Sequence, residues 1–410
     1  MIVDDLQRAV HDGRCELSAR LRGKDGHERR LWFRFPEAYA PAGEIDASPF
    51  LVAALVWCLR RGEDLEVDGP VSPRLLGEVE GIVNVYRSLR PGEMKPIAVS
   101  APAAPPQAPP ADMTACFFTR GVDSWFAALT AREDDPQTPP LTHAIFSRDF
   151  MSDYSGERYQ REFDSGATRA AEAAGLEVIH VETNQKREVR GAQLAAMALA
   201  LGPRRMLIAS GAMQGEIVPA GTHPVLDHRF TTERTDIVHY GDASRLAKVR
   251  RIARSPMALS TLRVCRVDEL ESDRNCGRCE KCVRSMLELH VEGALHRCPA
   301  FDGDLTPDRV AGVSTRLSRR HQWLDILHSL GSGDLDLRLR AAVRLVIARS
   351  DLLSAVDQAR ALAAEPGAAR LGRALPLAAR RAREGAWLLN RLLGGAAGKL
   401  RAGREPVESA

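Results

Sequence analysis

Apolar and polar positions follow a repeating pattern after residue 113, in which short apolar runs alternate with longer segments of helical periodicity. The short runs, which predict buried strands, cover residues 114–119, 142–147, 176–183 and 205–211. The helical segments between them begin near residues 122, 157 and 189. Strands that alternate with helices of this length form right-handed βαβ units. The predicted fold class is therefore α/β, with a doubly wound parallel sheet.

A smaller α/β domain is predicted for residues 1–100. The run RRLWFRF at 29–35 has the aromatic and apolar residues of a strand. SPFLVAALVWCLRR at 48–61 predicts a helix, because Ser and Pro suit its first positions and the arginines suit its last turn. Another helix is predicted from Pro73 to about Arg87. The proline-dense text that follows predicts a stiff linker over 101–112 and hence a domain boundary.

The C-terminal region, residues 306–410, is predicted to be helical. Candidate helices cover 320–330, 335–349, 352–364 and 368–393. This region holds 18 Lys and Arg residues against 10 Asp and Glu residues. Its last part is interpreted as an amphipathic helix that packs on the protein body, and attachment to an acidic membrane surface or partner is the alternative. The remaining stretch, 113–305, forms the third predicted domain.

Composition narrows the class of protein. Charged residues make up 27% of the chain and hydrophobic residues 44%, as in an ordinary globular protein. No apolar run approaches the roughly 18 residues of a membrane span, and the first residues do not look like a signal peptide. The formal net charge of +3 is too small to favour nucleic acid as a partner. We therefore expect a cytoplasmic protein without a membrane span.

Four of the eight cysteines fall within 18 residues, which favours a metal site in a reducing compartment over disulfides. They are Cys265, Cys276, Cys279 and Cys282. Two cysteines separated by two residues can bind one ion, and four thiolates form the closed tetrahedral shell of a structural Zn²⁺. Asn275 and Gly277 are expected to supply the turns, since both residue types tolerate positive φ. An iron–sulfur cluster is the competing interpretation, and a chance cluster of free thiols is the third.

The first strand of the 113–305 domain runs directly into a loop and a helix. The loop residues that would face a phosphate group are Thr119, Arg120, Gly121, Val122, Asp123 and Ser124. A helix N-terminus offers unpaired N–H groups and a positive dipole to an anion, and Asp or Ser can also cap the helix. The alternative is that these residues only begin an ordinary capped helix. Their position after the first strand of a βαβ series favours a nucleotide loop.

Further candidates follow from position on the predicted sheet. Ser147 ends the second strand, and Ser210 and Gly211 end the fourth, at the sheet edge that carries the loop. Arg245 and Lys248 lie three residues apart and would share one face of a helix, from which they could hold a leaving pyrophosphate. The alternative for this pair is a solvated surface helix. The stretch between the fourth strand and the cysteines also offers candidates in His223, Asp227, His228, His239 and Asp242, and a solvated surface position is the preferred interpretation for each histidine.

The loop resembles the signature of the PP-loop ATP pyrophosphatases, also called adenine nucleotide alpha hydrolases, which reads S-G-G-x-D-S. Gly121, Asp123 and Ser124 match its last three fixed positions, Thr119 replaces the serine, and Arg120 stands where the first glycine is expected. Arg120 could clash with the usual loop conformation and disable the loop, or it could supply a charge to the pyrophosphate. A PP-loop followed by this cysteine spacing resembles the zinc-containing 7-cyano-7-deazaguanine synthases over roughly residues 113–290. Residues 1–100 and 306–410 lie outside that pattern, so the resemblance is that of a relative.

This resemblance implies an AMP-forming carbon–nitrogen ligase that uses ATP and Mg²⁺. A small-molecule carboxylate would be adenylated, and ammonia or an amine would then form an amide or nitrile. Asp123, Ser124, Arg245 and Lys248 would act in catalysis, with Asp123 contacting Mg²⁺ and the zinc site shaping the active-site wall. Two alternatives remain: a sulfurtransferase that thiolates tRNA or a small molecule, using Cys116 or Cys298, and an inactive nucleotide-binding scaffold. The oligomeric state is open, with a homodimer as one option.

Overall fold

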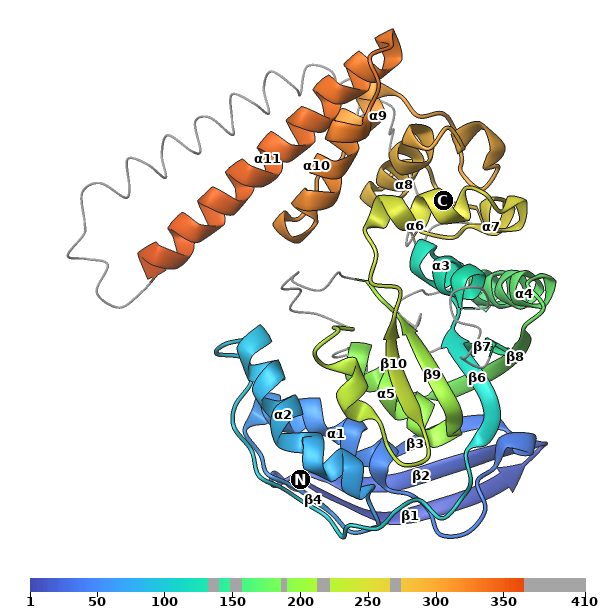
Figure 1. Ribbon diagram of the computed structural model, residues 1–410. Helices are drawn as coiled ribbons and strands as arrows, with labels where there is room; N and C mark the ends of the chain where they lie inside the picture. The colour runs from blue at the N-terminus through green and yellow to red at the C-terminus, as the bar shows by residue number, and fades with distance from the viewer. Residues whose placement is uncertain (132–139, 148–156, 186–189, 212–221, 266–273, 365–410) are drawn as a thin grey trace, which may run out of the picture. The chain divides into compact units, whose positions relative to one another are not determined.

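The computed structural model describes residues 1–131, 140–147, 157–185, 190–211, 222–265 and 274–364 (Figure 1). The chain divides into two compact units. The first consists of residues 1–275 with 297–300, and the second of residues 276–296 with the chain from 301 onward. Each unit is described separately below.

One ten-stranded sheet runs through the first unit, in the order β10-β9-β6-β7-β8-β3-β2-β1-β4-β5. Its strands are β1 (Ile2–His11), β2 (Arg14–Arg22), β3 (Glu28–Pro36), β4 (Leu65–Val67), β5 (Val99–Ser100), β6 (Ala111–Phe117), β7 (His143–Ser147), β8 (Glu177–Thr183), β9 (Pro203–Ala209) and β10 (Asp236–Tyr240). The last five are mutually parallel neighbours. The predicted α/β class with a mostly parallel central sheet is therefore confirmed at that level.

Helices join the parallel strands as the alternating pattern predicts. α3 (Val122–Thr130) follows β6, α4 (Glu157–Ala173) follows β7 and α5 (Arg190–Leu201) follows β8. Parallel strands direct their carboxyl ends to one edge of the sheet, so the last residues of β6, β7, β9 and β10 lie at that edge.

The first hundred residues do not form a separate sheet. β1, β2 and β3 form an antiparallel meander, and β3 pairs with β8, where Phe33 is opposite Thr183. Phe33 and Phe50 belong to the same buried cluster as Leu199 of α5. The predicted boundary at 101–112 therefore does not coincide with the division of the chain into compact units. The proline-dense sequence of residues 101–112 indicates an extended backbone. It does not indicate that the strands before and after it belong to separate sheets.

Two helices cover this part of the sheet. α1 (Ser48–Arg61) begins and ends where the sequence predicts, with a proline in its first turn and Gly62 at its C-cap in a left-handed conformation. α2 (Pro73–Leu89) begins after Ser72, whose hydroxyl accepts a hydrogen bond from the Leu75 N–H at 3.1 Å. α1 packs against α5, which joins the amino-terminal strands to the parallel half of the sheet.

The second unit is helical in its described part. It contains α8 (Glu280–Val291), α9 (Pro307–Gly312), α10 (Arg320–Ser329) and α11 (Asp334–Ala364). The helices predicted at 335–349 and 352–364 are one continuous helix, because no glycine or proline interrupts the text between them. The helix predicted at 368–393 lies outside the described residues. Among the helices that are described, none combines the length and apolar character that a membrane crossing needs.

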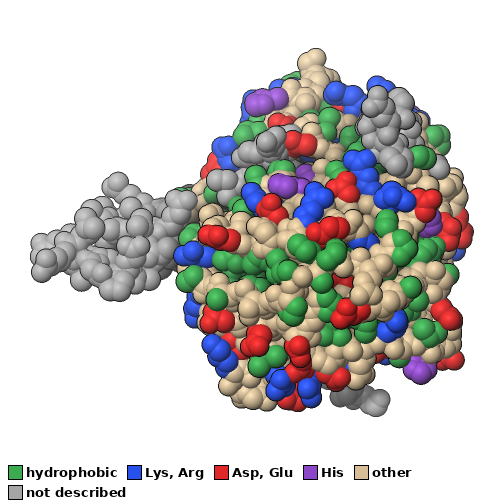
Figure 2. All heavy atoms as spheres, turned by 60° about the horizontal axis from the view of Figure 1, so that its bottom comes forward, with side chains coloured by type: hydrophobic (Ala, Val, Ile, Leu, Met, Phe, Trp, Pro, Cys, Tyr) green, Lys and Arg blue, Asp and Glu red, His purple; other side chains and the backbone are tan. Residues whose placement is uncertain are grey.

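Opposite charges are interspersed on the molecular face displayed in Figure 2. Ion pairs also occur within the meander, where Arg20 contacts Asp4 at 2.8 Å and Arg34 contacts Glu16 at 2.6 Å. Arg34 also stacks over the Trp32 ring at 4.1 Å. Neutralised charges of this kind do not make a basic track for a phosphate backbone.

Replacing Phe33 with alanine is expected to lower the free energy of unfolding by about 3–5 kcal/mol, because its side chain is fully buried. Since β3 pairs with β8, the substitution should also lower the hydrogen-exchange protection of the parallel half of the sheet. Urea denaturation followed by circular dichroism and by hydrogen exchange of β8 amides would measure both effects. Normal protection in β8 with a destabilised meander would show that the two halves unfold independently.

Candidate functional site

The loop between β6 and α3 has an unusual backbone at Arg120. Arg120 adopts φ +58°, in the left-handed region that glycine prefers, and is 3% exposed. Its carbonyl oxygen accepts a hydrogen bond from the Arg263 N–H at 2.9 Å. The arginine that departs from the PP-loop signature therefore takes the kind of conformation that the missing glycine would favour. A left-handed non-glycine residue carries a cost of about 1–2 kcal/mol, and such residues often lie at functional sites.

The N-terminus of α3 is not capped by a side chain, contrary to the cap predicted from Asp123 or Ser124. Gly121 is the N-cap residue with an ordinary φ of −70°. The Ser124 hydroxyl instead donates to the Gly121 carbonyl at 3.1 Å and accepts from the Thr119 N–H at 3.3 Å, which closes the loop on itself. Val122 is buried in the first turn. Helix N–H groups without a side-chain cap are the arrangement that binds anions.

Two basic residues from α6 (Arg245–Ile252) converge on Asp123 in the first turn of α3. The Lys248 Nζ lies 3.3 Å from one Asp123 carboxylate oxygen, and an Arg245 guanidinium nitrogen lies 3.5 Å from the other. Lys248 also donates to the carbonyl oxygen of Ser210, at the end of β9. These residues are up to 125 positions apart in sequence, and the prediction that Arg245 and Lys248 share one helix face holds.

Burial sets the electrostatic character of this group. The Lys248 side chain is 4% exposed and that of Arg245 14%, whereas that of Asp123 is 36% exposed. Two sheltered cations thus flank one partly exposed carboxylate at a helix N-terminus. A buried ammonium group is costly unless it is paired and hydrogen-bonded, so the neighbours of Lys248 explain how it is retained. The site has an excess of positive charge, which suits a polyphosphate.

The other predicted residues lie near the same sheet edge without joining this group. Ser147 ends β7 and is buried, and its hydroxyl has no hydrogen-bond partner within the described part of the chain. Gly211 is exposed directly after Ser210. The assignment of Ser147 and Gly211 to the adenine or phosphate part of a nucleotide stays a prediction from position.

Asp227 and His239, which the sequence offers as candidates with a solvated surface position preferred for the histidine, form a buried histidine–carboxylate pair beside this edge. The His239 Nδ1 in β10 lies 2.7 Å from a carboxylate oxygen of Asp227, whose other oxygen accepts from the His223 N–H at 3.2 Å. Asp227 is fully buried, and burial raises the pKa of its carboxyl group while His239 opposes that shift. His239 stands one residue before the carboxyl end of a parallel strand, and that position is the signal that could have revealed it.

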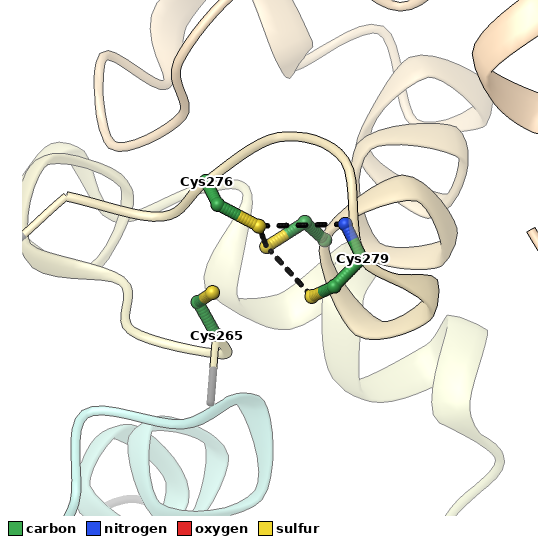
Figure 3. A group of neighbouring side chains, drawn as sticks. Cys265, Cys276 and Cys279 are labelled. Carbon is green, nitrogen blue, oxygen red and sulfur yellow. Dashed lines mark hydrogen bonds between the residues drawn. The ribbon is translucent and has the colours of Figure 1, made fainter. Parts of the chain in front are cut away.

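The four clustered cysteines form a group whose sulfur atoms all lie within 4.8 Å of one another. The Cys279 and Cys282 sulfurs are 3.4 Å apart, and those of Cys276 and Cys282 are 3.8 Å apart. The Cys279 N–H also donates to the Cys276 sulfur at 3.4 Å. Figure 3 shows the sulfurs of Cys265, Cys276 and Cys279 directed toward one another. Four ligands about 2.3 Å from a tetrahedral ion would be about 3.8 Å apart, so the group can bind a metal ion such as zinc.

The turn that presents these thiols requires glycine at one of the two predicted positions. Gly277 has φ +64°, and a Cβ atom there would lie 1.9 Å from the Asp302 carbonyl oxygen. Asn275 does not adopt a positive φ, so that part of the turn prediction is wrong. Its side chain instead makes hydrogen bonds in the interior, where it is fully buried. Asparagine tolerates a positive φ, but the residue type alone does not show that Asn275 adopts one.

Comparisons of the chain with protein-family models, curated proteins and solved structures found no match. The class defined by the observations is thus an α/β protein that has a mostly parallel sheet, an uncapped helix N-terminus with converging cations, and a four-cysteine group able to bind a metal.

Proposed function

We propose that this protein is an ATP-dependent, AMP-forming carbon–nitrogen ligase of the PP-loop type. One observation carries the proposal: Arg245 and Lys248 converge on Asp123 at the uncapped N-terminus of α3. The alternative interpretation of α6, a solvated surface helix, does not account for Lys248, whose side chain is 4% exposed. A phosphate chain at this position would meet helix N–H groups and two fixed cations.

The first step would be adenylation of a carboxylate. An oxygen of the substrate carboxylate forms a bond to the α-phosphorus of ATP, and the bond from that phosphorus to the pyrophosphate oxygen breaks. Lys248 and Arg245 would hold the negative charge that develops on the leaving pyrophosphate. Asp123, with a partly exposed carboxylate, would bind Mg²⁺, which supplies further charge neutralisation when present.

The second step would form the amide. The nitrogen of ammonia or an amine attacks the carbonyl carbon of the acyl-adenylate, the carbon–oxygen bond to AMP breaks, and the nitrogen loses a proton. The chain's contribution would be to hold the adenylate in the orientation for attack and to exclude water. The clustered cysteines would bind Zn²⁺ and shape the neighbouring chain without taking part in bond making.

The buried thiols argue against the sulfurtransferase alternative. Burial raises the pKa of the Cys116 thiol to about 12, and it also raises that of Cys298, whose sulfur donates to the Leu259 carbonyl at 3.1 Å. Sulfur transfer needs a thiolate that can reach the activated substrate. The scaffold alternative rests on Arg120 disabling the loop, and the left-handed conformation of that residue, which a glycine would also favour, argues against a clash there.

Native protein treated with iodoacetamide at pH 8.5 is therefore expected to remain unmodified at Cys116. A raised pKa keeps the thiol protonated below that pKa, and the side chain is fully buried. Peptide mass spectrometry would quantify alkylation, with urea-unfolded protein as the positive control. Rapid native labelling of Cys116 would restore the sulfurtransferase alternative.

The proposed activity is tested with ATP, Mg²⁺, ammonium and a panel of small carboxylic acids. Adenylation followed by amide formation releases pyrophosphate and AMP in equal amounts only when the correct acid is present. Hydroxylamine added in place of ammonium would trap the activated acid as a hydroxamate. Release of ADP and phosphate instead would contradict the AMP-forming mechanism, and absence of ATP binding by calorimetry would contradict the nucleotide site.

A further inference from the structure

The side chain of Asn275 forms a hydrogen-bonded clamp between the chain segments that carry the first two clustered cysteines. Its carbonyl oxygen accepts from the N–H groups of Val264 at 2.8 Å and Cys265 at 3.0 Å. Its amide nitrogen donates to the carbonyl oxygens of Leu262 at 2.8 Å and Ala300 at 2.9 Å. Asn275 is fully buried and directly precedes Cys276. No isosteric carboxylate can replace it, since only an amide both donates and accepts.

Arg263 connects this clamp to the loop of residues 119–124, between β6 and α3. Its guanidinium donates to the Arg274 carbonyl at 2.9 Å and to the Asn275 side-chain oxygen at 3.2 Å. Its backbone N–H donates to the Arg120 carbonyl at 2.9 Å. Arg263 is 4% exposed and stands two residues before Cys265. A continuous set of hydrogen bonds thus joins a metal-ligating segment to the one loop residue with a strained backbone.

The strain at Arg120 gives this connection an energetic role. A left-handed arginine is disfavoured by about 1–2 kcal/mol, so the loop shape needs support from contacts outside it. The Arg263 N–H is such a contact, and its position depends on how firmly the 262–265 segment is held. Cys265 would be fixed by a bound metal at one end of this segment, and Asn275 fixes its backbone.

We propose that Asn275 and Arg263 are positioning residues that couple metal binding at the four cysteines to ATP binding at the loop. The proposal rests on the proposed nucleotide site. Metal bound at Cys265 orders the 262–265 segment, which holds Arg120 in the conformation that admits the phosphates. Because coupling of binding free energies is reciprocal, ATP must raise the affinity for zinc by the same factor by which zinc raises the affinity for ATP. We expect a factor of about ten.

The experiment measures both directions of this coupling in the full-length protein. Zinc affinity is determined by competition with a chromogenic chelator, with and without saturating Mg·ATP, and ATP affinity is determined by calorimetry on zinc-loaded protein. Asn275→Ala removes the clamp, and Arg263→Met removes its guanidinium contacts. Asn184→Ala is the matched control, because Asn184 bridges the Trp32 N–H at 3.0 Å and the Arg30 carbonyl at 2.7 Å far along the sheet. Direct binding of zinc by ATP affects all variants equally.

Wild-type protein and the Asn184→Ala variant are expected to bind zinc about tenfold more tightly with Mg·ATP. The Asn275→Ala and Arg263→Met variants should still take up zinc at saturation but show a factor near one. An unchanged zinc affinity in wild-type protein that binds ATP would overturn the coupling and leave the ligase proposal standing. Absence of ATP binding to zinc-loaded wild-type protein would overturn both. A full tenfold factor in either folded variant would show that these two residues do not carry the coupling.

Discussion

Replacing Lys248 with methionine is expected to slow substrate-dependent pyrophosphate release by about 100- to 1000-fold. Lys248 is a sheltered cation, 4% exposed, held beside Asp123 and the Ser210 carbonyl. A charge fixed in a low-dielectric site stabilises a leaving pyrophosphate more strongly than a solvated charge does, and it needs no reorganisation during the reaction. Methionine preserves most of the volume and removes the charge together with the N–H donors to Asp123 and the Ser210 carbonyl.

The fold should tolerate this change. Removing a buried ammonium group removes its desolvation cost, and Asp123 keeps both solvent contact and Arg245. The matched control is Arg250→Met, a charge removal at an exposed position of the same helix. It should leave the rate within a few-fold of wild type. A Lys248→Met enzyme that retains full pyrophosphate release, or equal losses in both variants, would contradict the role assigned to Lys248.

Local signals in the sequence predicted most elements of the parallel half of the sheet. Proline at the helix start and two terminal arginines sufficed to locate α1, because capping and dipole preferences act within one turn. The three-residue spacing of Arg245 and Lys248 likewise placed both on one face of α6. Chemistry that depends on one helix or one loop can be predicted from a single sequence.

Long-range pairing could not be predicted in the same way. The alternation in β3 indicates a strand but does not identify β8, some 150 residues later, as its neighbour. Asp227 and His239 stand in a stretch rich in histidine and charged residues, but the sequence does not show that a short turn and a parallel strand bring their side chains within 2.7 Å. The roles of Asn275 and Arg120 depend on partners in other segments of the chain. Residue type alone therefore suggested a turn for Asn275 and a clash for Arg120.

Replacing Cys282 with serine is expected to abolish tight metal binding and to lower the melting temperature. Cys282 is fully buried and its sulfur lies 3.4 Å from Cys279 and 3.8 Å from Cys276, so three thiols would remain around the ion. Serine is a poor ligand for zinc at neutral pH. If free zinc is about 1000 times the dissociation constant, binding stabilises the folded state by about 4 kcal/mol. For a chain of 410 residues, whose unfolding entropy is about 0.9 kcal/mol/K, its loss corresponds to a fall of about 5 °C.

Elemental analysis of purified protein measures the metal content directly, and one zinc ion per wild-type chain is expected. Cys298→Ser is the matched control, because that buried thiol lies outside the four-cysteine group and serine can also donate to the Leu259 carbonyl. It should keep the metal and most of the thermal stability. Chelator added to wild-type protein should reproduce the Cys282→Ser melting curve. Iron with visible absorbance would identify a cluster in place of zinc, whereas a Cys282→Ser protein with full metal content would show that the four thiols are not the ligands.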